Sequence, residues 1–147
     1  MEQHPPDGEA QQDATPATPV ALAIGVDLLE RNRLLRTYQR FGDRFLRKVF
    51  TDTELEQAGG RAERLVGRFV AKEACAKALG TGIGQVAWKE IEVVRLPGGK
   101  PTLRLHGRAA ALAAALGLTA FDVSISDTHG HTLAVVVGAG YSRTERG

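Results

Sequence analysis

The segment from residue 62 to residue 79 constrains the fold of this chain more than any other. Its apolar residues recur every three or four positions, the period of one helical face, and they are Leu65, Val66, Phe69, Val70 and Ala74. Gly80-Thr81-Gly82 follows and ends the helix, because glycine commonly closes helices. Glu73 and Lys77 are four residues apart and fall on one side of it. This segment therefore predicts an amphipathic helix that carries two charged groups close together.

The chain before this helix shows three further patterns. Residues 20–26 alternate apolar side chains, which predicts a strand with one buried face that ends at Asp27. Residues 28–50 space their apolar groups by three or four and predict one long or two shorter basic helices. Thr51 to Glu54 has the form of a capping box, which starts a short helix.

The chain after this helix favours strands. We expect a hairpin of two strands, an alanine-rich helix and two more strands, at residues 91–96, 102–105, 108–116, 121–125 and 133–137. A chain of 147 residues is long enough for one hydrophobic core. The predicted fold is a single α+β domain with a small, mainly antiparallel sheet of about five strands and helices packed on one face.

The ends of the chain and its composition set the expected location. Residues 1–18 lack apolar periodicity and are predicted to form a flexible acidic tail, with the domain at 19–140 and a short tail at 141–147. No apolar run approaches the roughly 20 residues of a membrane span, and no secretory signal opens the chain. With one cysteine, Cys75, no internal disulfide can form. We expect a cytoplasmic protein without membrane association.

Positive charge is concentrated in one segment. The net charge is +2, yet residues 1–18 hold four acids and no bases, so the remainder carries +6. Residues 31–48 contain seven bases and a single acid, Asp43, a surplus of six. A one-signed segment of this kind attracts a polyanion, which could be nucleic acid, a phosphorylated cofactor or an acidic protein.

Five motifs, in order, resemble those of a known family. They are Gly25-x-Asp27, Arg68-Phe-Val-Ala-Lys-Glu-Ala-x-x-Lys77-Ala, Gly80-Thr-Gly-Ile83, Gly99-Lys-Pro101 and Val123-Ser-Ile-Ser-Asp127. Together they are similar to the short bacterial holo-acyl-carrier-protein synthases, over roughly residues 22 to 137. The Lys-Glu-Ala-x-x-Lys element alone would be a weak signal, whereas five elements in order are much stronger. The resemblance implies transfer of 4'-phosphopantetheine from coenzyme A to a serine of an apo acyl carrier protein, with magnesium.

The resemblance also implies roles for three charged residues. Asp27 and Glu73 would hold the metal, and Lys77 would contact the phosphates; together they are the expected catalytic residues. Magnesium commonly takes one or two protein carboxylates and leaves its other positions to phosphate and water, so this set would suffice. The residues alone leave other interpretations open. Glu73 and Lys77 could form an exposed helical ion pair, and Asp27 could accept backbone hydrogen bonds in a turn.

Coenzyme A contacts are expected at further positions. Arg68 and Lys77 would bind phosphate, the backbone of Gly80, Thr81 and Gly82 would approach the nucleotide, and Asp127 would lie at the cofactor site. Many family members have histidine where this chain has Asp127, so a mechanism that needs an imidazole there is in doubt. The base that takes the serine proton stays open between a metal-bound water, Asp27 and Glu73.

The family's carrier-docking residues match Arg33, Arg44 and Lys48 in the basic segment. The resemblance further implies a homotrimer with active sites at subunit boundaries, and Arg33 is expected to act across the interface from Glu73. Two other functions compete with transfer. A non-catalytic module would bind the carrier or coenzyme A without turnover, and a nucleic-acid-binding domain would use the arginines. Aromatic residues make up only 5% of the chain, few for base stacking, so we expect no nucleic acid partner.

Overall fold

A computed structural model describes residues 20–141 of the chain. The two predicted tails lie outside these residues, apart from Tyr141, which is the last residue of a strand. The elements in chain order are β1 (Val20–Glu30), α1 (Arg31–Val49), α2 (Asp52–Ala58), α3 (Glu63–Ala78), the 3-10 helix η1 (Trp88–Glu90), β2 (Ile91–Arg95), β3 (Pro101–Leu105), α4 (Gly107–Ala115), β4 (Ala120–Asp127) and β5 (His131–Tyr141). Within the described part of the chain, no helix is both long and apolar enough to cross a membrane.

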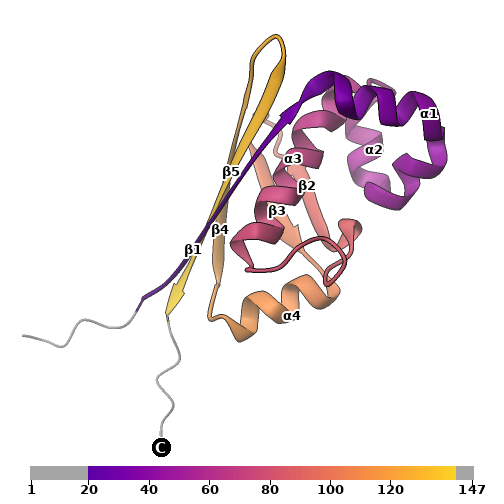
Figure 1. The fold of residues 1–147 in the computed structure, drawn as a ribbon. Coiled ribbons are helices and arrows are strands. Elements are labelled where there is room, and N and C mark those ends of the chain that lie inside the picture. The colour runs from indigo at the N-terminus through magenta and orange to yellow at the C-terminus, as the bar shows by residue number, and fades with distance from the viewer. Residues whose placement is uncertain (1–19, 142–147) are drawn as a thin grey trace, which may run out of the picture.

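Two antiparallel sheets form the β layer. The larger sheet has the order β1-β5-β4, and β5 pairs with β1 along its whole length, from Glu30 opposite His131 to Val20 opposite Tyr141. The smaller sheet is the β2-β3 hairpin. The helices lie on one side of the larger sheet, with α3 packed along it (Figure 1). The predicted α+β class, mainly antiparallel with helices on one face, is confirmed.

Strand β1 turns its small residues toward α3. Ala21, Ala23 and Gly25 occupy the face that packs on the core. A Cβ at Gly25 would lie only 1.9 Å from the backbone oxygen of Ala74, so only glycine allows the two backbones to approach this closely. The small residues of β1 therefore set how near α3 lies to the sheet.

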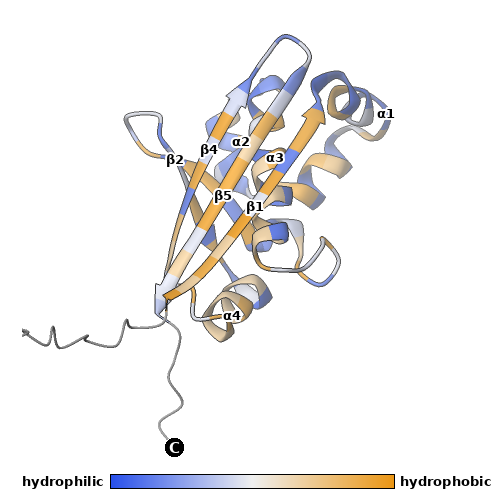
Figure 2. Ribbon diagram, turned by 60° about the vertical axis from the view of Figure 1, so that its left-hand side comes forward, coloured by the Kyte–Doolittle hydropathy of each residue, from blue (hydrophilic) through white to orange (hydrophobic). Residues whose placement is uncertain are grey.

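The large apolar residues of β1 point the other way. Val20, Leu22, Ile24, Val26 and Leu28 are 50–75% exposed. Figure 2 shows β1 and β5 side by side in mostly hydrophobic colours, with the helices behind them. The alternation predicted the strand correctly, but the assignment of the large residues to the buried face is wrong. Both faces of β1 carry apolar residues, and the alternation alone does not indicate which face packs on a helix.

Two boundaries also differ from the expected ones. Strand β1 continues three residues beyond Asp27 to Glu30, so Asp27 lies within the strand rather than at its end. The basic helix α1 is interrupted at Gly42, whose φ of 61° is non-helical and suits glycine. Of the two alternatives expected from the sequence, one long helix or two shorter ones, the structure has two helical pieces on either side of Gly42.

Candidate functional site

Asp27 reaches the helix layer because of its place in β1. It is two residues beyond Gly25, so its side chain lies on the same face of the strand, toward α3. The Nζ of Lys77 donates to the Oδ1 of Asp27 at 3.0 Å and to the backbone oxygen of Val26 at 3.1 Å. Lys77 therefore pairs with β1, across the layer, rather than forming the simple helical pair with Glu73.

Glu73 lies one turn before Lys77 on α3 and shares a cavity with Asp27. The cavity has a volume of about 400 Å³. Its polar lining is Asp27, Arg33, Thr37 and Glu73, and its apolar lining is Leu28, Leu29, Leu34, Phe45 and Phe69. Two acidic residues far apart in sequence thus line one open cavity, which we call the carboxylate cavity.

The electrostatics of the carboxylate cavity favour a cation. Burial and then the negative charge of Asp27 raise the pKa of Glu73, while Lys77 and Arg33 oppose the shift. A raised pKa means that the ionised carboxylate is destabilised here, and a bound cation would relieve that cost. Residues 20–141 contain no group of three or more His, Cys, Asp or Glu placed to hold a metal. Two carboxylates beside open space fit magnesium, which keeps waters and substrate oxygens as its other ligands.

Arg33 lines the carboxylate cavity of its own chain. It lies in the first turns of α1, which follows directly from β1, and its charge acts on Glu73 of the same subunit. Within one chain Arg33 thus lies at the same cavity as Glu73, and the expectation that it acts on Glu73 across a subunit interface stays a prediction. Because only a few residues separate Asp27 from the start of α1, Asp27 and Arg33 lie at the same cavity.

A second cavity of about 290 Å³ brings together two predicted cofactor residues, Arg68 and Asp127. Its full lining is Gln57, Glu63, Arg64, Gly67, Arg68, Arg95 and Asp127, and we call it the arginine cavity. It includes β4, whereas the carboxylate cavity includes β1, and β5 separates these strands. The two cavities therefore lie on opposite flanks of α3 in one chain.

Arg68 is 1% exposed and already engaged by its neighbours. It donates to the backbone oxygens of Val93 and Arg64 at 3.3 and 2.8 Å and to the Oε1 of Gln57 at 3.0 Å. Burial, and then the charge of Arg95, lower its pKa. On the other side of the cavity, the Oδ1 of Asp127 accepts a hydrogen bond from Thr132 at 2.6 Å.

The remaining predicted residues lie outside both cavity linings. Gly80 has a φ of 74°, and the backbone nitrogen of Thr81 donates to Ala76 at 3.0 Å, so the predicted helix stop is confirmed. The cofactor role of Gly80, Thr81 and Gly82 stays a prediction. Arg44 and Lys48 are exposed on the second piece of α1.

Sequence reasoning missed several residues that line the two cavities. Phe69 was assigned to the core stripe of α3, yet it also lines the carboxylate cavity and stacks on Trp88 with ring centroids 4.8 Å apart. Arg64 lies one turn before Arg68, a spacing that could have indicated it. Arg95 arrives from β2, and no local pattern connects it to the others.

Comparisons with known proteins show the family to which this chain belongs. Residues 23–136 match the model of the 4'-phosphopantetheinyl transferase superfamily. A holo-[acyl-carrier-protein] synthase of Koribacter versatilis is 43% identical over 120 residues, covering 79% of this chain and 96% of that protein.

Solved structures are similar as well. The holo-[acyl-carrier-protein] synthase of Helicobacter pylori in complex with coenzyme A has a TM-score of 0.71 at 28% identity and covers 78% of this chain and 98% of that one. The ACPS-CoA complex from Chronobacterium ammoniagenes has a TM-score of 0.73 at 30% identity, covering 84% and 99%. Since the family model matches most of the chain, this protein belongs to the 4'-phosphopantetheinyl transferase superfamily.

Proposed function

We propose that this protein is a holo-acyl-carrier-protein synthase, which transfers 4'-phosphopantetheine from coenzyme A to a serine of an apo acyl carrier protein. One observation carries the proposal: Asp27, Arg33 and Glu73 line one cavity, and Lys77 is 3.0 Å from Asp27. The relatives named holo-[acyl-carrier-protein] synthase and the similar structures that hold coenzyme A support it. The products are the holo carrier and adenosine 3',5'-bisphosphate.

The reaction exchanges one P–O bond for another. The serine oxygen forms a bond to the phosphorus that bears the pantetheine arm, and the bond from that phosphorus to the bridging oxygen breaks. Magnesium would supply a positive charge beside the diphosphate oxygens. Asp27 and Glu73 would hold it, and Lys77 would bind a phosphate oxygen after exchanging part of its contact with Asp27. The serine proton passes to a carboxylate or a water of the site.

Charge on α1 suits an acidic protein substrate. Arg44 and Lys48 are exposed on the same helix that places Arg33 at the carboxylate cavity. A basic surface that leads to the reacting groups would speed encounter with an acidic carrier and fix its orientation. We also propose a cytoplasmic location, because the one cysteine, Cys75, is free and buried, as is common in reducing compartments.

A homotrimer would complete the site. The exposed apolar row of β1 continues onto β5 at Leu133, Val137 and Tyr141, and a soluble monomer rarely leaves so many large apolar residues exposed together. The metal residues and the arginine cavity lie on opposite flanks of α3 in one chain. Cyclic packing of copies through the row would allow the carboxylate cavity of one subunit to share a substrate with the arginine cavity of the next.

The activity is tested by incubating the protein with coenzyme A, magnesium and an apo carrier protein, then weighing the carrier. We expect a gain of one phosphopantetheine group that disappears with a metal chelator or with Glu73→Gln. Binding without any mass gain over several carriers would favour the non-catalytic module. Binding of nucleic acid that weakens steeply with salt and ignores coenzyme A would favour the third hypothesis.

Sharing between subunits is tested by mixing inactive variants. Glu73→Ala damages the carboxylate cavity and Arg64→Glu damages the arginine cavity. If sites are shared, random mixing of equal amounts restores about a quarter of wild-type activity, because that fraction of boundaries joins two intact halves. Arg33→Ala mixed with Glu73→Ala tests whether Arg33 acts across the interface: recovery would support that role, and no recovery would confine Arg33 and Glu73 to the cavity of one chain. No recovery with the first pair would reject shared sites.

A further inference from the structure

Helix α3 buries two cations that do not line the carboxylate cavity. Arg68 is 1% exposed and Lys72 is fully buried. Lys72 directly precedes Glu73, yet its side chain lies among α2, η1 and β2 rather than beside Asp27. The transfer reaction proposed above gives Lys72 no role.

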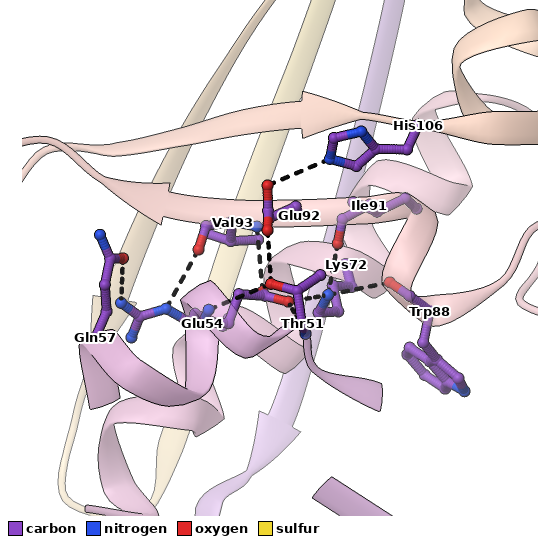
Figure 3. A network of polar contacts seen from close by, with 10 residues as sticks. Thr51, Glu54, Gln57, Lys72, Trp88, Ile91, Glu92, Val93 and His106 are labelled. Atoms are coloured by element: carbon purple, nitrogen blue, oxygen red, sulfur yellow. Dashed lines mark hydrogen bonds and ion pairs between the residues drawn. The ribbon is translucent and has the colours of Figure 1, made fainter. Parts of the chain in front are cut away.

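The ammonium of Lys72 uses all three of its donors inside the protein. It donates to the Oε1 of Glu54 at 2.7 Å and to the backbone oxygens of Trp88 and Ile91 at 3.0 and 2.5 Å (Figure 3). Glu54 is equally enclosed and accepts further bonds from the backbone nitrogens of Thr51 and Val93 at 3.0 and 3.1 Å. This ion pair therefore connects four elements: α2, α3, η1 and β2.

The same face of α3 satisfies the open edge of strand β2. Ile91 and Val93 offer backbone oxygens to Lys72 and Arg68, and the backbone nitrogen of Val93 donates to Glu54. Farther along, Gln57 both donates to and accepts from the backbone of Arg95. Side chains of α2 and α3 thus take the place of a neighbouring strand. Because these hydrogen bonds depend on direction, they fix the rotation of α3 about its own axis.

Because a helix is rigid, the rotation of α3 about its axis also sets the position of Glu73 on its other face. Arg68 and Lys72 are four residues apart and face β2, while Glu73 and Lys77 are four apart and face β1. Side-chain ends lie about 6 Å from a helix axis, so a rotation of roughly 10° moves a carboxylate by about 1 Å. A displacement of about 1 Å in a catalytic group can cost on the order of a hundredfold in rate.

Stability alone does not explain a buried ion pair at this position. Apolar residues of similar volume often stabilise a core as well as an ion pair does, because two charges must lose their water. What apolar residues lack is direction, and Lys72 with Glu54 supplies five directed bonds to the backbone and to each other.

We propose that Lys72, held by Glu54, is a positioning residue that sets the rotation of α3 and so aims Glu73 at the ion it would share with Asp27. The inference rests on the proposed function, since Glu73 needs aiming only if it holds the metal. Lys72, the first lysine of the Lys-Glu-Ala-x-x-Lys element, would then orient the metal-binding residue Glu73 on the opposite face of the same helix.

The test compares Lys72→Met and the doubly neutral Glu54→Gln/Lys72→Met with wild type. Lys89→Met, at an exposed lysine of η1, is the matched control.

We expect the dissociation constant for Mn²⁺, measured from its spin-resonance signal, to rise about 10- to 100-fold in the two test variants, as for other residues that orient metal ligands. We expect kcat to fall with smaller changes in KM for coenzyme A and carrier, and to recover at high magnesium. Glu73→Gln should not recover.

Hydrogen exchange gives a readout independent of metal and turnover. Amides of residues 73–77 should exchange faster in folded Lys72→Met than in Lys89→Met. Folded test variants with wild-type Mn²⁺ affinity and kcat would overturn the proposal, and so would failure of both variants to fold, which would assign Lys72 to folding alone. A wild-type chain that binds Mn²⁺ but transfers nothing would defeat the proposed function, and the Mn²⁺ comparison would still decide the role of Lys72.

Discussion

Among the residues of the carboxylate cavity, Glu73 has a pKa that the fold raises. Burial and the nearby Asp27 raise its pKa, so folding favours the neutral carboxyl over the ionised one. A group of this kind contributes stability below its unfolded pKa, near 4.5, and that contribution is lost as pH rises through the higher folded pKa. Ionised Glu73 therefore costs stability near neutral pH unless a cation is bound.

Glu73→Gln removes this cost. In the presence of a chelator we expect the variant to have a higher melting temperature than wild type at pH 8, and the difference to vanish near pH 4. Added magnesium should stabilise wild type and leave the variant unchanged. Calorimetry at several pH values checks the sign, with Glu56→Gln, an exposed acid of α2, as control. A variant less stable than wild type at pH 8 without metal would contradict this account.

Gly25 sets the distance between β1 and α3. A methyl group there would lie 1.9 Å from the backbone oxygen of Ala74 and 2.6 Å from the backbone nitrogen of Ala78, and backbone atoms of a helix cannot move aside singly. We expect Gly25→Ala to lower the unfolding free energy by about 1–3 kcal/mol or more. It should also lower kcat, because Asp27 and Glu73 move apart. Gly98→Ala, with nothing within 4 Å, should be near neutral in urea unfolding.

At the scale of elements, the start of α2 joins helix and hairpin. Thr51 caps the helix by accepting from the backbone nitrogen of Glu54 at 3.2 Å and donates to the Oε2 of Glu92 on β2 at 2.6 Å. We expect Thr51→Ala to lower the unfolding free energy by about 1–2 kcal/mol. Thr53→Ala, an exposed threonine of the same helix, should change it by less than about 0.5 kcal/mol. Equal effects at both positions would contradict the assigned cap.

The elements themselves were largely predictable because each has a local cause. The capping box at Thr51 and Glu54 is present as predicted, and the stripe of α3 and the hairpin signature give their elements within a few residues. The burial of Arg68 and Lys72 was not predictable. Their partners, the backbone of β2 and Glu54, come from other parts of the chain, and no periodicity signals a cation that faces inward.

At the scale of the whole molecule, the exposed apolar row is the surface through which we propose that copies of the chain assemble. Ile24 is 72% exposed in one chain and would be buried between copies. We expect Ile24→Glu to convert the assembly to monomers in sedimentation and to lower transfer at least tenfold, because a buried carboxylate opposes association. The helical signal in circular dichroism should persist. Leu116→Glu, at a 45% exposed leucine that directly follows α4, should leave the assembly intact.

The site could be predicted only in part for a related reason. Asp27, Glu73 and Lys77 came from motifs, and the structure places them together. The position of Arg33 at the cavity of its own chain was not expected, since sequence does not indicate that α1 folds back over the cavity beside its own β1. Arg95 joins the arginine cavity only through the path of β2, which no motif describes.

The outward face of β1 has a consequence for how the protein is made. Strand β1 is eleven residues long, lies at the edge of its sheet and exposes large apolar side chains on one face. Until it is covered, it is a template for unwanted pairing with any similar strand nearby. Yield in a recombinant host should thus depend on temperature and on the pace of translation. Polar substitutions along this row should reduce aggregation during expression and, in the same step, reduce transfer activity.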